Sequence, residues 1–325
     1  MRMNILVTSL LPLAWSLVAK AGLVNTALMP SATLSSDQRV TNGTLVSQEN
    51  APFLVRLLLI SGNLQGLCGG TIIDSTTIVT AGHCVHDRAT GMTKSPSDTY
   101  VFFGSVSSDS RDYIQPTEVI LHPEYNPRDF RNDIAVLRVP PLKITKGKVE
   151  PIAIYNNNIE PRQAMEIYGW GTTRSHGTAR DNPPSLLTQT VYVSEPKACQ
   201  VIEPRYQNAN EYQICTDANY NVGVDACQGD SGTGSTIKYK GTQYFAGLVS
   251  YGTDRYASAT CGEANSFGMY TRVSHYLSWI TSLGGSYKLS PSIDSTPTAE
   301  PSPTTSTPPD KPKPTTTCYF FFICF

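Results

Sequence analysis

The chain has 325 residues, 40% of them hydrophobic, with 25 basic and 26 acidic side chains. This hydrophobic fraction, together with 24 glycines and 23 prolines, is typical of a globular, turn-rich protein with a sizeable core. The formal charge of −1 and the absence of any run of lysine and arginine exclude electrostatic capture of nucleic acid or of an anionic membrane surface.

The first 21 residues have the features of a secretory signal peptide. Arg2 supplies a positive charge, residues 5–19 are mostly apolar, and Ala19 and Ala21 form the small-x-small pattern of a cleavage site. The apolar run is shorter than the ~20 residues that span a bilayer, so we favour a signal peptide over a membrane anchor and expect no stable membrane insertion. Export predicts a secreted, extracellular protein whose eight cysteines form disulfides.

Beyond residues 22–39, which are small and polar, the sequence predicts many short β-strands. Runs rich in Val, Ile, Leu and aromatic residues recur between turn residues. These runs cover residues 53–60, 77–81, 100–104, 134–139, 165–168, 244–250 and 269–273. One helix is predicted from Ser274 to about Leu283, because Tyr276, Leu277 and Ile280 fall on one face. Many strands with one terminal helix favour an all-β barrel or sandwich.

The composition changes near Gly284. Between Ser290 and Thr317, 21 of 28 residues are Pro, Ser or Thr, a composition that cannot build a core. We therefore expect residues 285–325 to form a disordered tail. Its last eight residues are apolar but too few to cross a membrane.

Three segments carry residue types suited to nucleophilic catalysis. Residues 80–84 place His83 beside Cys84 after an apolar strand, and residues 132–137 place Asp133 at the start of another. Residues 225–232 place Ser231 in a glycine-flanked turn. A serine nucleophile needs a nearby base, the base needs an orienting carboxylate, and the developing oxyanion needs fixed donors.

In this order, the three segments resemble the trypsin-like (chymotrypsin-fold) serine peptidases, and the resemblance covers roughly residues 40–284. It implies two six-stranded antiparallel β-barrels with a C-terminal helix. It also implies that His83 is the general base, that Asp133 orients it, and that Ser231 is the nucleophile. The backbone N–H groups of Gly229 and Ser231 would then form the oxyanion hole.

Two rival chemistries fit less well. The α/β-hydrolase motif Gly-x-Ser-x-Gly requires a glycine where this chain has Thr233, and that fold orders its triad Ser, acid, His. Neither Cys-x-x-Cys nor His-Glu-x-x-His is present, so no zinc site is predicted. The segment after Gly104 lacks the evenly placed acidic residues of the calcium loop in some relatives. We expect no metal and no cofactor.

Disulfide pairing rests on the resemblance alone. It pairs Cys68 with Cys84, Cys199 with Cys215, and Cys227 with Cys261. Without it, six cysteines would allow fifteen connectivities. Cys318 and Cys324 remain in the tail.

The resemblance also implies a substrate pocket with Asp225 at its floor. A carboxylate there favours a cationic side chain, Lys or Arg, before the scissile bond. Gly252 and Gly268 match the glycines of the pocket wall, and Ser250 and Tyr251 match the segment that binds substrate backbone. The expected partners are protein or peptide substrates with Lys or Arg at the cleavage position, and protein inhibitors.

Residues 38–43 resemble the activation site of the same family. Cleavage after Arg39 would free the amine of Val40, which would then pair with the carboxylate of Asp230. This predicts a propeptide at residues 22–39 and a peptidase domain at residues 40–284. The sequon at Asn42 lies next to that cleavage site.

The chain departs from the family pattern in two places. Gly232-Thr233-Gly234 stands where Gly-Gly-Pro is usual, and Tyr251 stands where tryptophan is commoner. The main prediction is an active secreted endopeptidase that cuts after Lys or Arg and is made as a zymogen. The alternative is a non-catalytic binding protein on the same fold.

Overall fold

The computed structural model describes residues 43–173, 181–254 and 261–293. By contacts the chain divides into two units, Met1–Asp37 and Gln38–Phe325, and every described residue belongs to the second. The predicted signal peptide, the propeptide, the Arg39–Val40 cleavage site and residues 294–325 of the predicted tail lie outside the described residues.

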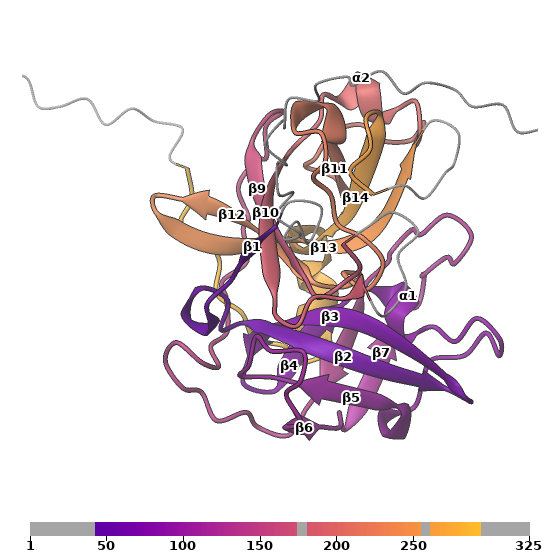
Figure 1. Cartoon of the computed structure of the whole chain (residues 1–325), viewed down its shortest axis with the longest axis vertical. Coiled ribbons are helices and arrows are strands. Elements are labelled where there is room, and N and C mark those ends of the chain that lie inside the picture. The colour runs from indigo at the N-terminus through magenta and orange to yellow at the C-terminus, as the bar shows by residue number, and fades with distance from the viewer. Residues whose placement is uncertain (1–42, 174–180, 255–260, 294–325) are drawn as a thin grey trace, which may run out of the picture. The chain divides into compact units, whose positions relative to one another are not determined.

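The first sheet holds seven antiparallel strands from the N-terminal half of the domain. Figure 1 shows these strands as one group of arrows. In spatial order they are β6 (Tyr113–Ile114), β5 (Thr99–Phe102), β2 (Leu54–Ser61), β3 (Leu64–Asp74), β4 (Thr77–Thr80), β8 (Ala135–Arg138) and β7 (Glu118–Leu121). Side chains of β2 alternate between buried and half-buried over much of its length, the pattern of a strand with one face on a core.

The second sheet also holds seven antiparallel strands, from the C-terminal half and one N-terminal edge. In spatial order they are β1 (Thr44–Leu45), β10 (Leu187–Tyr192), β9 (Ala164–Gly169), β12 (Gly234–Tyr239), β13 (Thr242–Asp254), β14 (Ser266–Arg272) and β11 (Gln213–Asp217). The predicted fold class is therefore confirmed: the chain is mostly β, with two antiparallel sheets and a short C-terminal helix.

Each sheet has seven strands instead of the six expected. The difference comes from two-residue edge strands, β6 in the first sheet and β1 in the second. β1 joins the second sheet by pairing with β10, although it lies at the N-terminal end of the described chain. Strands of two residues carry no periodicity that a sequence pattern could reveal.

Four hydrophobic clusters lie within the described part of the chain, and the three largest organise the domain. One lies within the first sheet around Leu57 and Ile72, and another within the second around Ile167 and Tyr270. The third joins the two sheets and includes Phe53, whose ring meets that of Tyr168 edge-on at 6.1 Å. Because burying apolar area is the main favourable term in folding, this third cluster fixes the sheets against each other.

The C-terminal helix is shorter than predicted. A 3-10 turn, η5 (Val273–Tyr276), leads into α3 (Leu277–Ser282), and Ile280 is fully buried in the cluster between the sheets. The other helical segments are short: η1 (Gln48–Asn50), α1 (Gly82–Val85), η2 (Pro96–Asp98), α2 (Pro196–Cys199) and η4 (Ala218–Tyr220).

The ordered chain continues past the predicted domain boundary at Gly284. Leu289 forms a parallel bridge with Ile154, and the backbone N–H of Ile154 donates to Lys288 O at 2.8 Å. Asn157 Nδ2 donates to Pro291 O, also at 2.8 Å. The first nine residues of the expected tail, 285–293, are thus part of the packed domain. Backbone hydrogen bonds depend little on side-chain type, so composition did not indicate this segment.

The described residues form three disulfides, which join the pairs that the resemblance implied: Cys68–Cys84, Cys199–Cys215 and Cys227–Cys261. No helix within the described ranges is long and apolar enough to cross a membrane.

Removing either of the first two disulfides is expected to cost similar stability. Both close a separation of 16 residues, worth about 3 kcal/mol in the chain-entropy model. We therefore expect C68A/C84A and C199A/C215A to lower the free energy of unfolding by about this amount in urea denaturation. A loss confined to one of the two double variants would show that native-state strain, and not loop closure, sets the contribution.

Candidate active site

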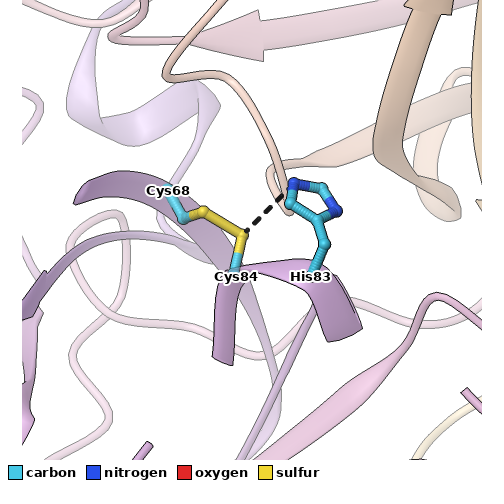
Figure 2. Close-up of side chains that lie close together, drawn as sticks. All are labelled: Cys68, His83 and Cys84. Atoms are coloured by element: carbon cyan, nitrogen blue, oxygen red, sulfur yellow. Dashed lines mark hydrogen bonds between the residues drawn. A yellow bond between two sulfur atoms is a disulfide. The ribbon is translucent and has the colours of Figure 1, made fainter. Parts of the chain in front are cut away.

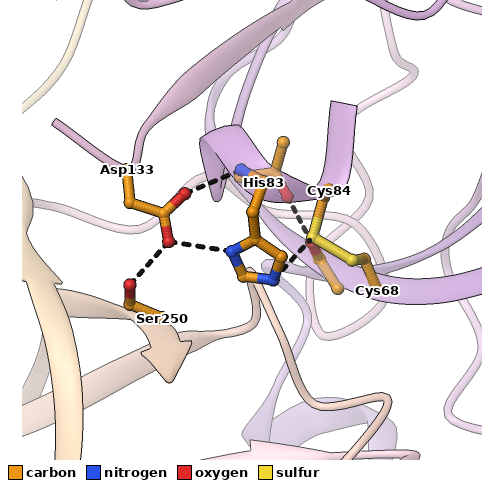
Figure 3. Close-up of a disulfide and its surroundings, with 7 residues drawn as sticks. Cys68, His83, Cys84, Asp133 and Ser250 are labelled. Carbon is orange, nitrogen blue, oxygen red and sulfur yellow. Dashed lines mark hydrogen bonds and ion pairs between the residues drawn. A yellow bond between two sulfur atoms is a disulfide. The ribbon is translucent and has the colours of Figure 1, made fainter. Parts of the chain in front are cut away.

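The side chain of His83 is held by a fully buried carboxylate. Asp133 has no exposed surface, and its Oδ1 accepts from the backbone N–H of His83 at 2.7 Å. Its Oδ2 lies 2.8 Å from His83 Nδ1 (Figure 3). A carboxylate on Nδ1 favours the tautomer with its proton there, which leaves Nε2 free to accept one.

A third donor to the carboxylate comes from the second sheet. Ser250 Oγ donates to Asp133 Oδ2 at 2.5 Å (Figure 3). The β13–β14 register shifts between Val249 and Tyr251, so a bulge at Ser250 turns its side chain toward the first sheet. The sequence placed Ser250 with the substrate-binding residues. The structure puts its hydroxyl on Asp133, while the residue also lines the substrate-sized cavity.

Gly82 explains how His83 comes so close to Asp133. A Cβ at Gly82 would lie 3.1 Å from the backbone nitrogen of Ile134 and 3.2 Å from Asp133 Oδ1. Gly82 is the residue directly before His83, and because it has no side chain, α1 can approach the start of β8 closely.

A disulfide lies against the other side of the imidazole. His83 Nε2 is 3.9 Å from Cys84 Sγ, which is bonded to Cys68 (Figure 2). Among the described residues these three side chains form the one cluster with the ligand types of a metal site. Both sulfurs are in the disulfide, so the cluster offers no thiolate to a metal.

Ser231 lies in a turn that needs glycine on both sides. Gly229 has φ +98° and Gly232 has φ +75°, a region that residues with side chains rarely adopt. A Cβ at Gly229 would be 2.9 Å from Gly171 Cα, and one at Gly232 would be 2.7 Å from Gly69 O. The turn is therefore packed closely against backbone from both sheets.

His83 and Ser231 line the same cavity of about 470 Å³. The two side chains are not hydrogen-bonded to each other in the described structure. Such bonds are often long in the absence of substrate and tighten on binding.

The backbone around Ser231 leaves two donors free. The N–H groups of Asp230, Gly232 and Thr233 each bond a backbone carbonyl. Within the described part of the chain, the N–H groups of Gly229 and Ser231 have no such acceptor. Two unused donors on either side of Asp230 could therefore bind one oxygen atom.

Asp225 lines the same cavity as His83 and Ser231. It is 3% exposed, and its Oδ1 accepts from Ala226 N at 2.8 Å. The backbone N–H of Gly262 also acts on the carboxylate, but no cation among the described residues pairs with it. Burial raises the pKa of this carboxyl to about 7.

The cavity wall above Asp225 is free of side chains at two facing positions. Gly252 and Gly268 are directly opposite each other in the β13–β14 ladder. A Cβ at Gly268 would lie 3.0 Å from Asp225 Oδ1 and 2.7 Å from Thr216 Oγ1. Any side chain there would fill the space next to the carboxylate.

Asp230 is a second buried carboxylate. Its two oxygens accept from the backbone N–H groups of Gly171 at 2.6 Å and Cys227 at 2.8 Å. Burial raises its pKa to about 7, and no cation of the described residues pairs with it. The predicted partner, the Val40 amine, lies outside the described residues.

The sequence analysis missed several residues that line the cavity, among them Phe130, Arg88 and Tyr270. Phe130 lies edge-on to His83, with ring centroids 5.8 Å apart, and it faces Tyr251 at 5.0 Å. Arg88 lines the cavity mouth, and Tyr270 lies near Asp225. Phe130 lies three residues before Asp133, and Arg88 lies five residues after His83. Their closeness in sequence to predicted site residues could have indicated that they belong to the site.

Comparison with known proteins decides the family. The family model described as Trypsin matches residues 40–280, most of the chain and all of the site above. The chain belongs to the trypsin family of serine proteases.

Individual relatives of this trypsin-family chain are distant. Vitamin K-dependent protein C of Mus musculus is 29% identical over 264 residues, 78% of this chain and 53% of the relative. Trypsin eta of Drosophila melanogaster is 30% identical over 263 residues, 78% of this chain and 91% of the relative. Mannan-binding lectin serine protease 1 of Homo sapiens is 27% identical, over 76% of this chain and 36% of the relative. The chain spans about half the length of the protein C relatives that it matches.

Thr233, the departure from the usual trypsin-family pattern, is accommodated by a glycine in β3. Thr233 is fully buried, and a Cβ at Gly69 would overlap its Oγ1. Gly69 N donates to Ser231 O at 2.7 Å, so the same contact holds the turn that carries Ser231 against β3.

We expect Gly69→Ala to destabilise the domain by about 1–3 kcal/mol, the usual cost of overpacking. Because Thr233 supplies the clash, the cost should fall when Gly69→Ala is made in a Thr233→Gly background. Gly66→Ala in the same strand is the matched control, since its Cβ would have no neighbour closer than 3.8 Å. Urea denaturation of the four variants measures this coupling. Equal costs in the two backgrounds would show that Thr233 does not limit the space at Gly69.

Proposed function

We propose that the protein is a secreted serine endopeptidase that cuts peptide bonds after Lys or Arg and is made as a zymogen. The observation that carries this proposal is the Asp225 carboxylate, which pairs with no cation among the described residues and lines the same cavity as His83 and Ser231. A buried charge without a partner is costly, so a substrate cation that reaches it is bound strongly.

The triad geometry supports acyl-enzyme chemistry. In the proposed reaction, Ser231 Oγ attacks the substrate carbonyl carbon while His83 Nε2 takes its proton. Asp133 holds the ring through Nδ1 and stabilises the positive charge that develops. The protonated Nε2 then gives its proton to the leaving amine, the C–N bond breaks, and an ester to Ser231 remains. Water hydrolyses the ester by the same transfers in reverse.

The free N–H groups of Gly229 and Ser231 support a role in stabilising the oxyanion. The carbonyl oxygen gains negative charge during the attack, and two fixed donors near the nucleophile meet it without reorganisation. Loss of one such donor costs on the order of 100- to 1,000-fold in rate.

Asp225→Asn is expected to lower activity and raise stability together. In the activated enzyme, kcat/KM on Arg and Lys peptides should fall by roughly 100- to 1,000-fold, because an amide cannot pair with the cation. The ratio to Phe peptides should fall in parallel. An unchanged Arg-to-Phe ratio would remove Asp225 from the pocket floor.

The stability gain should depend on pH. Burial raises the pKa of Asp225 from 3.8 to about 7, so the folded state favours the protonated carboxyl. Stability from this preference is fully present below pH 4 and is lost as pH rises toward 7. The variant should match the parent chain at pH 4 and exceed it at pH 8, measured in a Ser231→Ala background to prevent self-cleavage.

Activation is proposed to follow cleavage after Arg39. The support is Asp230, buried with its carboxylate bonded only to backbone N–H groups among the described residues. The new Val40 amine would supply the missing cation. An ion pair in a buried setting is stable only when both partners are present, so the cleavage acts as a switch.

Arg39→Gln should give a chain that trypsin-like enzymes cannot activate. We expect less than about 1% of parent activity after the same treatment, since the switch has no other cation. Sequencing the active parent should show Val40 as its first residue. Active material that begins elsewhere would contradict this activation route.

Secretion is supported by the three disulfides, since such bonds persist in oxidising compartments. A serine-directed phosphonate probe separates the peptidase from a non-catalytic binding protein. Labelling of Ser231 after activation supports the peptidase, and no labelling would favour the binding protein.

A further inference from the structure

A second cavity continues from the first across the catalytic residues. It has a volume of about 330 Å³ and shares three lining residues with the first: His83, Arg88 and Ser231. Its other walls are formed by the Cys68–Cys84 disulfide, by residues 64–67 of β3 and by the turn that follows α1. Asp225 does not line it.

The chemistry of the proposed function says which part of a substrate lies there. The side chain before the scissile bond occupies the cavity that ends at Asp225. The leaving amine must receive its proton from His83 Nε2, so it lies on the histidine side of Ser231. The residues after the scissile bond therefore enter the second cavity.

Two charged residues that line this cavity, Lys94 and Asp87, form an ion pair with each other. Lys94 Nζ lies 3.5 Å from Asp87 Oδ2 and donates to Ile60 O at 3.1 Å. The Asp87 carboxylate also accepts from Ser61 Oγ and from the backbone N–H groups of Ala89 and Thr90. These contacts leave neither charge available to a substrate.

Arg88 differs from its neighbours. Its side chain is exposed, and it forms no ion pair with any of the described residues. The turn that carries it is fixed: His86 and Thr93 form a bridge, and Gly91 N donates to Asp87 O at 2.7 Å. A guanidinium on a fixed turn is suited to bind a carboxylate.

We propose that Arg88 selects substrates that carry Asp or Glu at one of the first two positions after the scissile bond. The inference rests on the proposed function. The two cavities then carry opposite charges. Asp225 meets the substrate residue before the scissile bond, and Arg88 meets the residues after it.

We place the acidic substrate residue after the scissile bond because of the residues that share the two cavities with Arg88. On the Asp225 side, the cavity that Arg88 also lines contains the rings of Phe130 and Tyr251, which suit apolar groups. On the leaving side, Arg88 shares the lining of the second cavity with the polar side chains of Ser61, Gln65 and His86, as well as with Leu59, Leu64 and Leu67.

The test uses the activated enzyme and Arg-containing peptides that differ only at the two positions after the bond. Glu should be favoured over Gln there by about two- to fivefold in kcat/KM, the size expected for an exposed ion pair, and Lys should be disfavoured. Arg88→Gln should abolish the preference and Arg88→Glu should invert it. In 1 M salt the preference should shrink.

Arg111→Glu is the matched control, because it makes the same charge change at an exposed arginine that lines neither cavity. It should leave the Glu-to-Lys ratio unchanged. Equal cleavage of all peptides would overturn the role of Arg88 and leave the proposed function standing. A preference that survives Arg88→Glu, or one for acidic residues before the bond, would also overturn it. Failure to cleave any peptide would overturn the proposed function itself.

Discussion

Two buried carboxylates that pair with no cation among the described residues, Asp225 and Asp230, are the constraint on which the site depends. Both lie within six residues of Ser231, and burial raises the pKa of each to about 7. A domain that kept them only for stability would do better with neutral side chains. Their cost is understandable if cations from elsewhere complete the site, a substrate side chain at Asp225 and a new N-terminus at Asp230.

The fold brings the residues of the site together at glycines, where the lack of a side chain lets two backbone segments approach each other closely. Gly82 lets the helix that carries His83 reach Asp133, and Gly69 makes room for Thr233 beside the nucleophile turn. The bulge at Ser250 then links the second sheet to the carboxylate of the first. The geometry of the candidate site is therefore a property of the contact between the two sheets, which the cluster around Phe53 and Tyr168 holds in place.

Much of this arrangement was readable from the sequence. The segments around His83, Asp133 and Ser231 identified the family, and through it the fold, the disulfide pairs and the glycines of the cavity wall. The sequence could not show the two-residue strands, because so few residues have no periodicity. It also missed the packed segment 285–293, which is held by backbone hydrogen bonds with Ile154 and by side-chain hydrogen bonds with Asp74 and Asn157. The contact of Ser250 with Asp133 depends on a register shift that no local pattern encodes, and the exposed Arg88 looks like any surface arginine until the cavities are seen.

The most direct test of the central claim is the proton balance when the activated enzyme binds benzamidinium, a planar cation that mimics an arginine head group. Calorimetry at pH 7 in buffers of different ionisation enthalpy measures it. If Asp225 is the pocket floor with a pKa near 7, binding must ionise it and release about half a proton at pH 7, and almost none at pH 9. Binding with no proton release at pH 7 would mean that no carboxyl group with a raised pKa meets the cation, and would contradict the account.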